Sequence, residues 1–274
     1  MHLSIFSDEI NPDPVRALHL AAAWGIPSVE VRSLPGGRFP QVDDAELVCF
    51  ERLLAEHGVA VSGVSPGFFK EGIDDPAVPR LLREALPRAC EWARRLGTDR
   101  VSCFGFRRDG SAEVPAAVID RLGEMAAITV AHGCRLSLEN EAVCWGDTGL
   151  EAAAIIRRVG APGLGLLWDP GNSARAGSRC PYPDEYLAVR DLVTHVHVKN
   201  YDPAANAWSL IERGMIDWPG QLRALVEDGY DGALVIETHT RISPDEFEVI
   251  DGDLDGLEAN SRRNLDFVRA HLGE

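Results

Sequence analysis

Acidic and imidazole side chains stand at the ends of four apolar segments in the second half of the chain. Each segment is short, and each ends in a group that can bind a cation or move a proton. The four endings are Glu139-Asn140-Glu141, Asp169-Pro170-Gly171-Asn172, His195-Val196-His197 and Glu237-Thr238-His239. A carboxylate at the end of a buried strand is costly to desolvate unless it pairs with a cation. The sequence therefore predicts that these groups gather around a common positive charge.

The third of these segments continues to Asn200 and alternates polar with apolar side chains. Its two valines fall on one parity, and His195, His197 and Lys199 fall on the other. Alternate residues of an extended strand face the same side, so both imidazoles and the ammonium point the same way. Such a face lines a polar site or meets solvent. Parity does not decide which histidine would bind a cation.

Each of these groups has a simpler explanation when it is taken alone. Glu139 could cap a helix or pair with an arginine, and Asp169 in Asp-Pro-Gly-Asn is a common turn former. His195 could be a hydrogen-bonded core residue, and His239 a loop residue. Glu237, after the run Ala-Leu-Val-Ile, is the hardest to explain in this way. The interpretation as one site depends on four successive segments ending alike.

Three carboxylates around one imidazole would repel one another without a cation, and some would take up protons. A divalent ion removes this repulsion. Such a ligand set is typical of an oxygen-preferring ion such as Mn2+, Mg2+ or Co2+, and less typical of a structural zinc. We therefore predict one bound divalent metal ion, with Zn2+ as the alternative.

The elements that must position these groups alternate regularly along the 274 residues. Predicted strands cover residues 3–7, 28–32, 59–64, 100–104, 135–141, 164–169, 195–200 and 233–237. Predicted helices cover residues 11–24, 43–57, 77–96, 112–132, 148–159, 184–189, 218–228 and 257–271. Eight strand–helix units in a chain of this length predict an α/β fold, a (β/α)8 TIM barrel forming a single domain over residues 1–274.

The longest predicted connections follow the last three strands and cover residues 170–183, 201–217 and 238–256. They lie at the carboxyl end of the barrel, where the active sites of such barrels are found. None of the strand–helix junctions has the glycine-rich pattern of a nucleotide-phosphate loop.

The chain carries a net charge of −16 and has a sequence pI near 4.9. Such a chain repels phosphate backbones and anionic lipid, so we expect no nucleic-acid or membrane partner. A local cluster of cations can still bind a small anionic substrate. The six cysteines have no metal-type spacing, and the N-terminus has no signal-peptide pattern. We expect a cytoplasmic protein that acts on a small molecule, with a homo-oligomer as one possible assembly.

Four short motifs, taken together in their order and spacing, resemble a known family. They are Leu-Ser-Leu-Glu-Asn at Glu139, Trp-Asp-Pro-Gly-Asn at Asp169, His-Val-His-Val-Lys at His197, and Val-Ile-Glu-Thr at Glu237. They are similar to the sugar phosphate isomerase/epimerase family of xylose isomerase-like TIM barrels, and the resemblance covers nearly the whole chain. Val-Glu-Val-Arg around Glu30 and the stretch 214–218 also resemble family features.

The resemblance implies one divalent metal ion held by Glu139, Asp169, His197 and Glu237. It favours His197 over His195, which it leaves one step deeper, where it would contact the substrate or support a ligand.

The resemblance also implies a reaction, namely proton transfer beside the carbonyl of a keto-sugar or related polyol through a metal-stabilised enediolate. Glu139 and Glu237 would be the proton-transferring carboxylates. Lys199 and Arg213 are candidates for binding a substrate hydroxyl, carboxylate or phosphate. The implied protein is a metal-dependent sugar isomerase or epimerase with a carbohydrate substrate.

One position departs from the ketose 3-epimerases of this family. Histidine is usual three residues after the aspartate, and this chain has Asn172 there. Asparagine can bind a substrate hydroxyl but cannot carry a proton. This departure leaves hydroxypyruvate isomerases and metal-dependent dehydratases of an inosose or 3-dehydroshikimate as alternatives. An endonuclease-IV-like hydrolase is less favoured, since it needs extra histidines on the third and fourth strands, which have none here.

Overall fold

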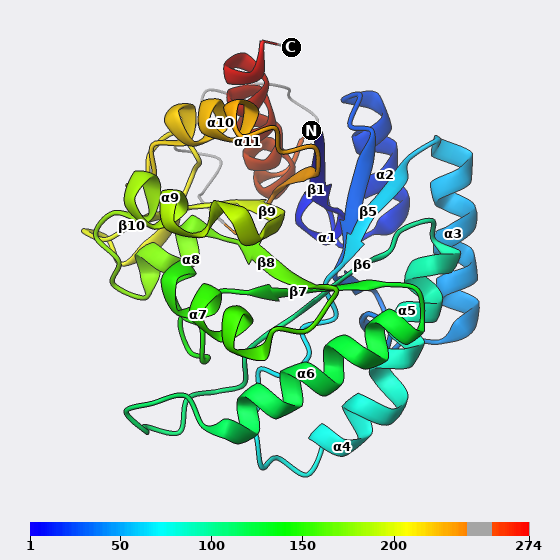
Figure 1. Cartoon of the computed structure of the whole chain (residues 1–274). Coiled ribbons are helices and arrows are strands. Elements are labelled where there is room, and N and C mark those ends of the chain that lie inside the picture. The colour runs from blue at the N-terminus through cyan, green and yellow to red at the C-terminus, as the bar shows by residue number, and fades with distance from the viewer. Residues whose placement is uncertain (240–253, 274) are drawn as a thin grey trace.

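The structure, a computed structural model, describes residues 1–239 and 254–273. Eight parallel strands form a closed barrel surrounded by helices (Figure 1), which confirms the predicted (β/α)8 fold. The strands follow one another around the barrel in chain order, and the last one closes against the first. They are β1 (His2–Phe6), β2 (Ser28–Val31), β5 (Ala60–Val64), β6 (Arg100–Cys103), β7 (Arg135–Glu139), β8 (Leu164–Trp168), β9 (Val193–Val198) and β12 (Ala233–Ile236).

The helices cover the outside of the barrel, and short elements fill the carboxyl end. The helices are α1 (Ser7–Ile10), α2 (Pro14–Ala23), α3 (Asp44–His57), α4 (Val78–Arg80), α5 (Leu86–Arg95), α6 (Ala116–Ala131), α7 (Gly149–Val159), α8 (Pro170–Arg175), α9 (Tyr186–Val189), α10 (Trp218–Glu227) and α11 (Gly256–Leu272). A π-helical turn over residues 81–85 joins α4 to α5. Two hairpins, β3 (Ser33–Leu34) with β4 (Gly37–Arg38) and β10 (Asn200–Asp202) with β11 (Ala207–Ser209), lie in connections that follow β2 and β9.

Prolines account for two differences from the predicted helix boundaries. The helix predicted from residue 11 begins only at Pro14 as α2, because Asn11 is extended and precedes Pro12, and α1 ends before it. The N-cap of α2 is Asp13, whose side chain accepts a hydrogen bond from the Val15 amide. The helix predicted from residue 112 begins only after Pro115.

The predicted loop 170–183 contains the short helix α8, which begins directly after Asp169. The predicted loop 201–217 contains most of the hairpin of β10 and β11. Of the third predicted loop, residues 240–253 lie outside the described residues.

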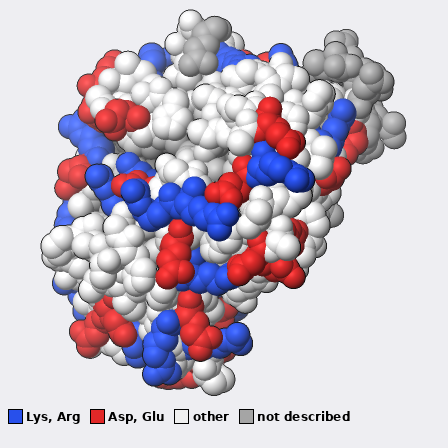
Figure 2. Space-filling view, turned by 90° about the vertical axis from the view of Figure 1, so that its right-hand side faces the viewer, with Lys and Arg blue, Asp and Glu red and all other residues white. Residues whose placement is uncertain are grey.

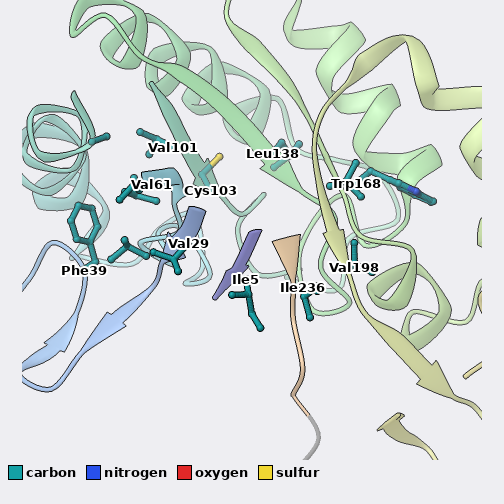
Figure 3. Packing of buried hydrophobic residues seen from close by; sticks show 14 of the residues in the cluster. Ile5, Val29, Phe39, Val61, Val101, Cys103, Leu138, Trp168, Val198 and Ile236 are labelled. Atoms are coloured by element: carbon teal, nitrogen blue, oxygen red, sulfur yellow. The ribbon is translucent and has the colours of Figure 1, made fainter. Parts of the chain in front are cut away.

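The main hydrophobic core lies between the barrel and the helices rather than inside the barrel. Alternate strand residues such as Ile5, Val61 and Leu138 are fully or nearly fully buried there. Figure 3 shows such side chains on the outside of the ring of strands. Because successive strand residues face opposite sides, the residues between them point into the barrel.

The inside of the barrel is polar. Ser4 on β1 and Ser62 on β5 hydrogen-bond at 2.7 Å, although β2 lies between their strands, so both hydroxyls point inward. The Arg100 guanidinium on β6 reaches across to the Thr194 carbonyl oxygen on β9 at 2.8 Å. This interior supports ionisable groups that an apolar core would exclude.

Basic as well as acidic side chains reach the surface, despite the net charge of −16. Figure 2 shows acidic and basic side chains interspersed on one face of the molecule. Ion pairs such as Arg95 with Glu51 and Arg88 with Asp44 account for part of this pattern. None of the helices in residues 1–239 and 254–273 combines the length and the apolar sequence that a membrane crossing requires.

Candidate metal centre

The four predicted metal ligands meet at the carboxyl end of the barrel. Glu139 ends β7, Asp169 follows β8, His197 lies near the end of β9, and Glu237 follows β12. One possible ligand atom from each residue lies within 4.8 Å of those from the other three, and all four residues are buried. Four adjacent parallel strands thus bring together groups that are nearly 100 residues apart in the chain.

The imidazole of His197 presents a free nitrogen to the carboxylates. Its Nδ1 atom lies 3.5 Å from Glu139 Oε1 and 3.6 Å from Glu237 Oε2, and within the described part of the chain it makes no hydrogen bond. Neighbouring ligands of an octahedral ion with bonds of about 2.1 Å stand roughly 3 Å apart. These separations and the donor set of three carboxylates with one imidazole fit a divalent ion of the Mg2+, Mn2+ or Co2+ type.

Glu30 supports this imidazole from below. Its Oε1 atom lies 3.3 Å from His197 Nε2, and its Oε2 atom lies 2.5 Å from His195 Nε2. The Ser65 hydroxyl also donates to Glu30. A carboxylate beside Nε2 favours the tautomer with its proton there, which leaves Nδ1 of His197 as a ligand. Burial would raise the pKa of Glu30, but His195 and His197 lower it well below its ordinary value.

His195 therefore lies deeper than His197. It contacts Glu30 and is not among the residues that line the cavity above the site. Of the two functions implied for it, contact with the substrate or support of a ligand, this placement favours support. Glu30 is absent from the predicted site residues, and the signal for it was an acid between valines in a buried strand.

Lys199 lies within the carboxylate cluster. Its ammonium nitrogen is 2.9 Å from Asp169 Oδ2 and 2.8 Å from Glu237 Oε2, and only 3% of its side chain is exposed. Burial disfavours the charge on Lys199, yet the two carboxylates overcome this and raise its pKa above the ordinary value. Burial raises the pKa of Asp169 to about 6, against the influence of Lys199. Lys199 is thus a built-in counter-ion for the cluster.

A second group of residues holds the other oxygen of Glu237, and sequence reasoning did not identify most of them. Arg32 contacts Glu237 Oε1 at 3.2 Å, Glu9 Oε1 at 2.8 Å and Asp8 Oδ2 at 3.0 Å. His239 Nδ1 lies 2.5 Å from Glu9 and 3.3 Å from Glu237. The signal for Arg32 was its position two residues after Glu30 on β2, with the same parity.

A cavity of about 130 Å³ opens above the cluster. Glu139, His197, Lys199 and Glu237 form its floor, and aromatic side chains form part of its wall. Those aromatic residues are Phe6, Phe104 and Trp208.

Of two further residues predicted to bind substrate, one lines the cavity and the other does not. Asn172 lines the cavity, and its amide nitrogen donates to Glu139 Oε1 at 3.1 Å. Its Oδ1 atom is buried and accepts no hydrogen bond from the described residues. Arg213 does not line the cavity, and its half-exposed side chain lies 3.6 Å from Glu212 Oε1. The structure thus brings Asn172, but not Arg213, to the predicted site.

Comparison with known proteins gives the family. Residues 18–271 match the family model described as xylose isomerase-like TIM barrel. An uncharacterized protein of Methanocaldococcus jannaschii is 26% identical in an alignment over 168 residues, and the match covers 58% of this chain and 57% of that relative. The match thus spans little more than half of the relative's length.

Solved structures show the same fold at low sequence identity. D-allulose 3-epimerase from Methylomonas sp. in complex with D-allulose has a TM-score of 0.74 and 18% identity, covering 99% of this chain and 97% of that one. The probable 3-DHS dehydratase AsbF from Bacillus anthracis has a TM-score of 0.74 and 13% identity, covering 97% and 99%. A xylose isomerase-like TIM barrel protein from Mycobacterium smegmatis in complex with magnesium has a TM-score of 0.68 and 23% identity, covering 94% and 89%. Because the family model matches most of its length, this chain belongs to the xylose isomerase-like TIM barrel family.

Proposed function

We propose that this protein is a divalent-metal-dependent sugar isomerase or epimerase that moves a proton beside the carbonyl of a keto-sugar or related polyol. The observation that carries the proposal is the Nδ1 atom of His197, which makes no hydrogen bond within the described residues and lies among three buried carboxylates. Glu139, Asp169, His197 and Glu237 would hold Mn2+, Mg2+ or Co2+. The bound ion would polarise the substrate carbonyl.

Glu139 and Glu237 are the residues that would transfer the proton. They come from β7 and β12, with β8 and β9 between them, so they approach the cavity from two sides. One carboxylate can remove the proton from the carbon beside the carbonyl, and either the same or the other one can return it. Return from the opposite side gives an epimer, and a shuttle between adjacent carbons gives an aldose–ketose isomer.

The surroundings of Glu237 keep it ionised, as a base must be. Burial would raise its pKa, but Lys199, His239 and His197 hold the pKa well below the ordinary value. Lys199 contacts one of its oxygens and Arg32 the other, which fixes the direction of the carboxylate. The carboxylate is therefore ionised and held in one direction before a substrate arrives.

Asn172 supports a second candidate, a metal-dependent dehydratase. Its amide nitrogen is bound to Glu139, and an asparagine at this position cannot relay a proton. A dehydratase of an inosose or of 3-dehydroshikimate uses the same proton abstraction and then loses a β-hydroxyl. The similarity in fold to a probable 3-DHS dehydratase agrees with this candidate but does not select it.

Product analysis distinguishes the candidates. Metal-loaded protein is incubated with ketoses, inososes and keto acids, and the products are identified by NMR spectroscopy. An epimer or aldose–ketose isomer supports the primary proposal, and an unsaturated product supports the dehydratase. Chelator-treated protein should lose the reaction and regain it with Mn2+, Mg2+ or Co2+. Absence of any product across the panel would contradict both candidates.

A further inference from the structure

We infer that the substrate carries an anionic group, a carboxylate or a phosphate, that Arg38 and Arg175 bind in the cavity wall. The inference rests on the proposed function, because it names the substrate class of the same site. A net charge of −16 gives the protein a general field that repels anions. Attraction of an anion therefore requires local cations that are free to bind it.

Three of the five cations that line the cavity already have carboxylate partners. Arg32 and Lys199 contact the acids described above, and Lys70 lies 3.0 Å from Glu141 Oε2. Arg38 and Arg175 have no carboxylate within ion-pair distance among residues 1–239 and 254–273. Among the described residues, they are the two cavity-lining cations whose charge is not balanced by a carboxylate contact.

Arg38 is held in place by backbone rather than by an acid. It lies on β4, and its Nε atom donates to the Pro66 carbonyl oxygen at 3.2 Å. Its guanidinium lies against Gly67, where an added Cβ would come within 2.9 Å of three guanidinium atoms. Burial and the neighbouring charge of Arg32 lower the pKa of Arg38. An anion bound here would offset the repulsion from Arg32.

Arg175 is held by an aromatic ring. Its guanidinium carbon lies 5.2 Å from the centre of the Trp208 ring, which also packs beside Lys199. Stacking fixes the plane of a guanidinium and leaves its N–H edge available for a carboxylate or phosphate.

The helix that carries Arg175, α8, also presents an oxygen that can accept a hydrogen bond from a substrate hydroxyl. Asn172 and Arg175 are three residues apart on α8, and both line the cavity. Asn172 is 1% exposed, and its Oδ1 atom has no hydrogen bond within the described residues. A cation beside a free, buried acceptor suits a polyhydroxylated anion better than a neutral polyol.

Three matched four-carbon probes test the inference by calorimetry: erythritol, erythronate and erythritol 4-phosphate. All three contain a polyol chain. Erythritol carries no anionic group, erythronate carries a carboxylate, and erythritol 4-phosphate carries a phosphate. Wild-type protein should bind at least one anionic probe about tenfold more tightly than erythritol, the gain expected for one charge-assisted bidentate contact. A preference between the two anions identifies the anionic group.

The variants Arg38→Met and Arg175→Met should each lose most of this preference while binding erythritol unchanged. Arg52→Met is the matched control, since Arg52 lies on α3 with 69% of its side chain exposed. Equal affinity for all three probes, no detectable binding of any probe, or wild-type anion affinity in both cavity variants would overturn the inference. The titrations are repeated on metal-free protein and involve no turnover, so their outcome is independent of whether the proposed reaction occurs.

Discussion

Glu30 Oε1 lies 3.3 Å from His197 Nε2, on the edge of the imidazole opposite the nitrogen that faces Glu139 and Glu237. The two residues belong to β2 and β9, which are not neighbours in the barrel. Their contact therefore crosses the barrel interior. It links the polar interior to the metal centre above it, because the orientation of the only imidazole in the proposed ligand set depends on a carboxylate from the other side.

Replacement of Glu30 by glutamine should weaken metal binding. The substitution keeps the shape but removes the charge that orients His197, and losses of such supporting groups cost about 10–100-fold in metal affinity. Isothermal titration with Mn2+ measures the effect. Glu56→Gln on the exposed surface of α3 is the control and should bind metal as the wild type does. A folded Glu30→Gln protein with unchanged affinity would refute this support function.

Replacement of Lys199 by methionine should make the free energy of unfolding depend more strongly on bound metal than it does in the wild type. Without metal, Asp169 and Glu237 lose the ammonium that lies between them. Removing one partner of a buried ion pair costs about 3–5 kcal/mol in the free energy of unfolding. Urea denaturation should show this loss without metal and a larger recovery on adding Mn2+ than in the wild type. Arg52→Met, at an ion pair whose two side chains are 69% and 57% exposed, should change stability little. Equal metal-induced stabilisation of Lys199→Met and the wild type would count against the counter-ion assignment.

Glu258 connects α11 to the N-terminal part of the chain. Its carboxylate accepts hydrogen bonds from both Arg16 Nε and Nη2 at 2.9 Å and from Asn11 at 2.8 Å. Glu258→Gln should lower the free energy of unfolding by about 1–3 kcal/mol at pH 7, the usual cost of losing hydrogen bonds to a charged group. Urea denaturation measures the difference.

This difference should depend on pH in a defined direction. The hydrogen bond from Arg16 lowers the pKa of Glu258 below its ordinary value. The ionised carboxylate therefore stabilises the fold fully above the unfolded-state pKa of about 4.3, and this stabilisation is lost as the pH falls through the lower folded-state value. The wild type and Glu258→Gln should become more alike in acid. A difference that stays constant from pH 7 to acid would contradict the assignment.

The barrel and its ligand set could be predicted because short stretches of consecutive residues indicate both. Apolar runs of strand length with glycine and proline boundaries mark the units, and a ligand lies at or just after the end of each late strand. Asp169 shows that two local explanations can both be correct, since its Oδ1 atom caps α8 by accepting from the Asn172 amide while its Oδ2 atom faces Lys199.

The remaining contacts depend on distances across the barrel, which one sequence does not encode locally. Glu30 and His195 are 165 residues apart and meet only because the sheet closes. Arg213 illustrates the opposite case, as a charged residue in an expected site loop whose side chain lies outside the cavity lining. The contact of Glu30 with His197 and the group around Arg32 became visible only in three dimensions, as did the two wall arginines that have no carboxylate partner among the described residues.

The most direct test of proton transfer at this centre is the incorporation of solvent deuterium, followed by NMR at the carbon beside the substrate carbonyl. Metal-loaded wild-type protein and the Glu56→Gln control should exchange this proton in at least one ketose, inosose or keto acid. Glu237→Gln, compared at saturating metal, should be slower by about 10²–10⁴-fold, the contribution expected of a positioned general base. No exchange in the wild type across the panel, or exchange at the wild-type rate in Glu237→Gln, would contradict the account.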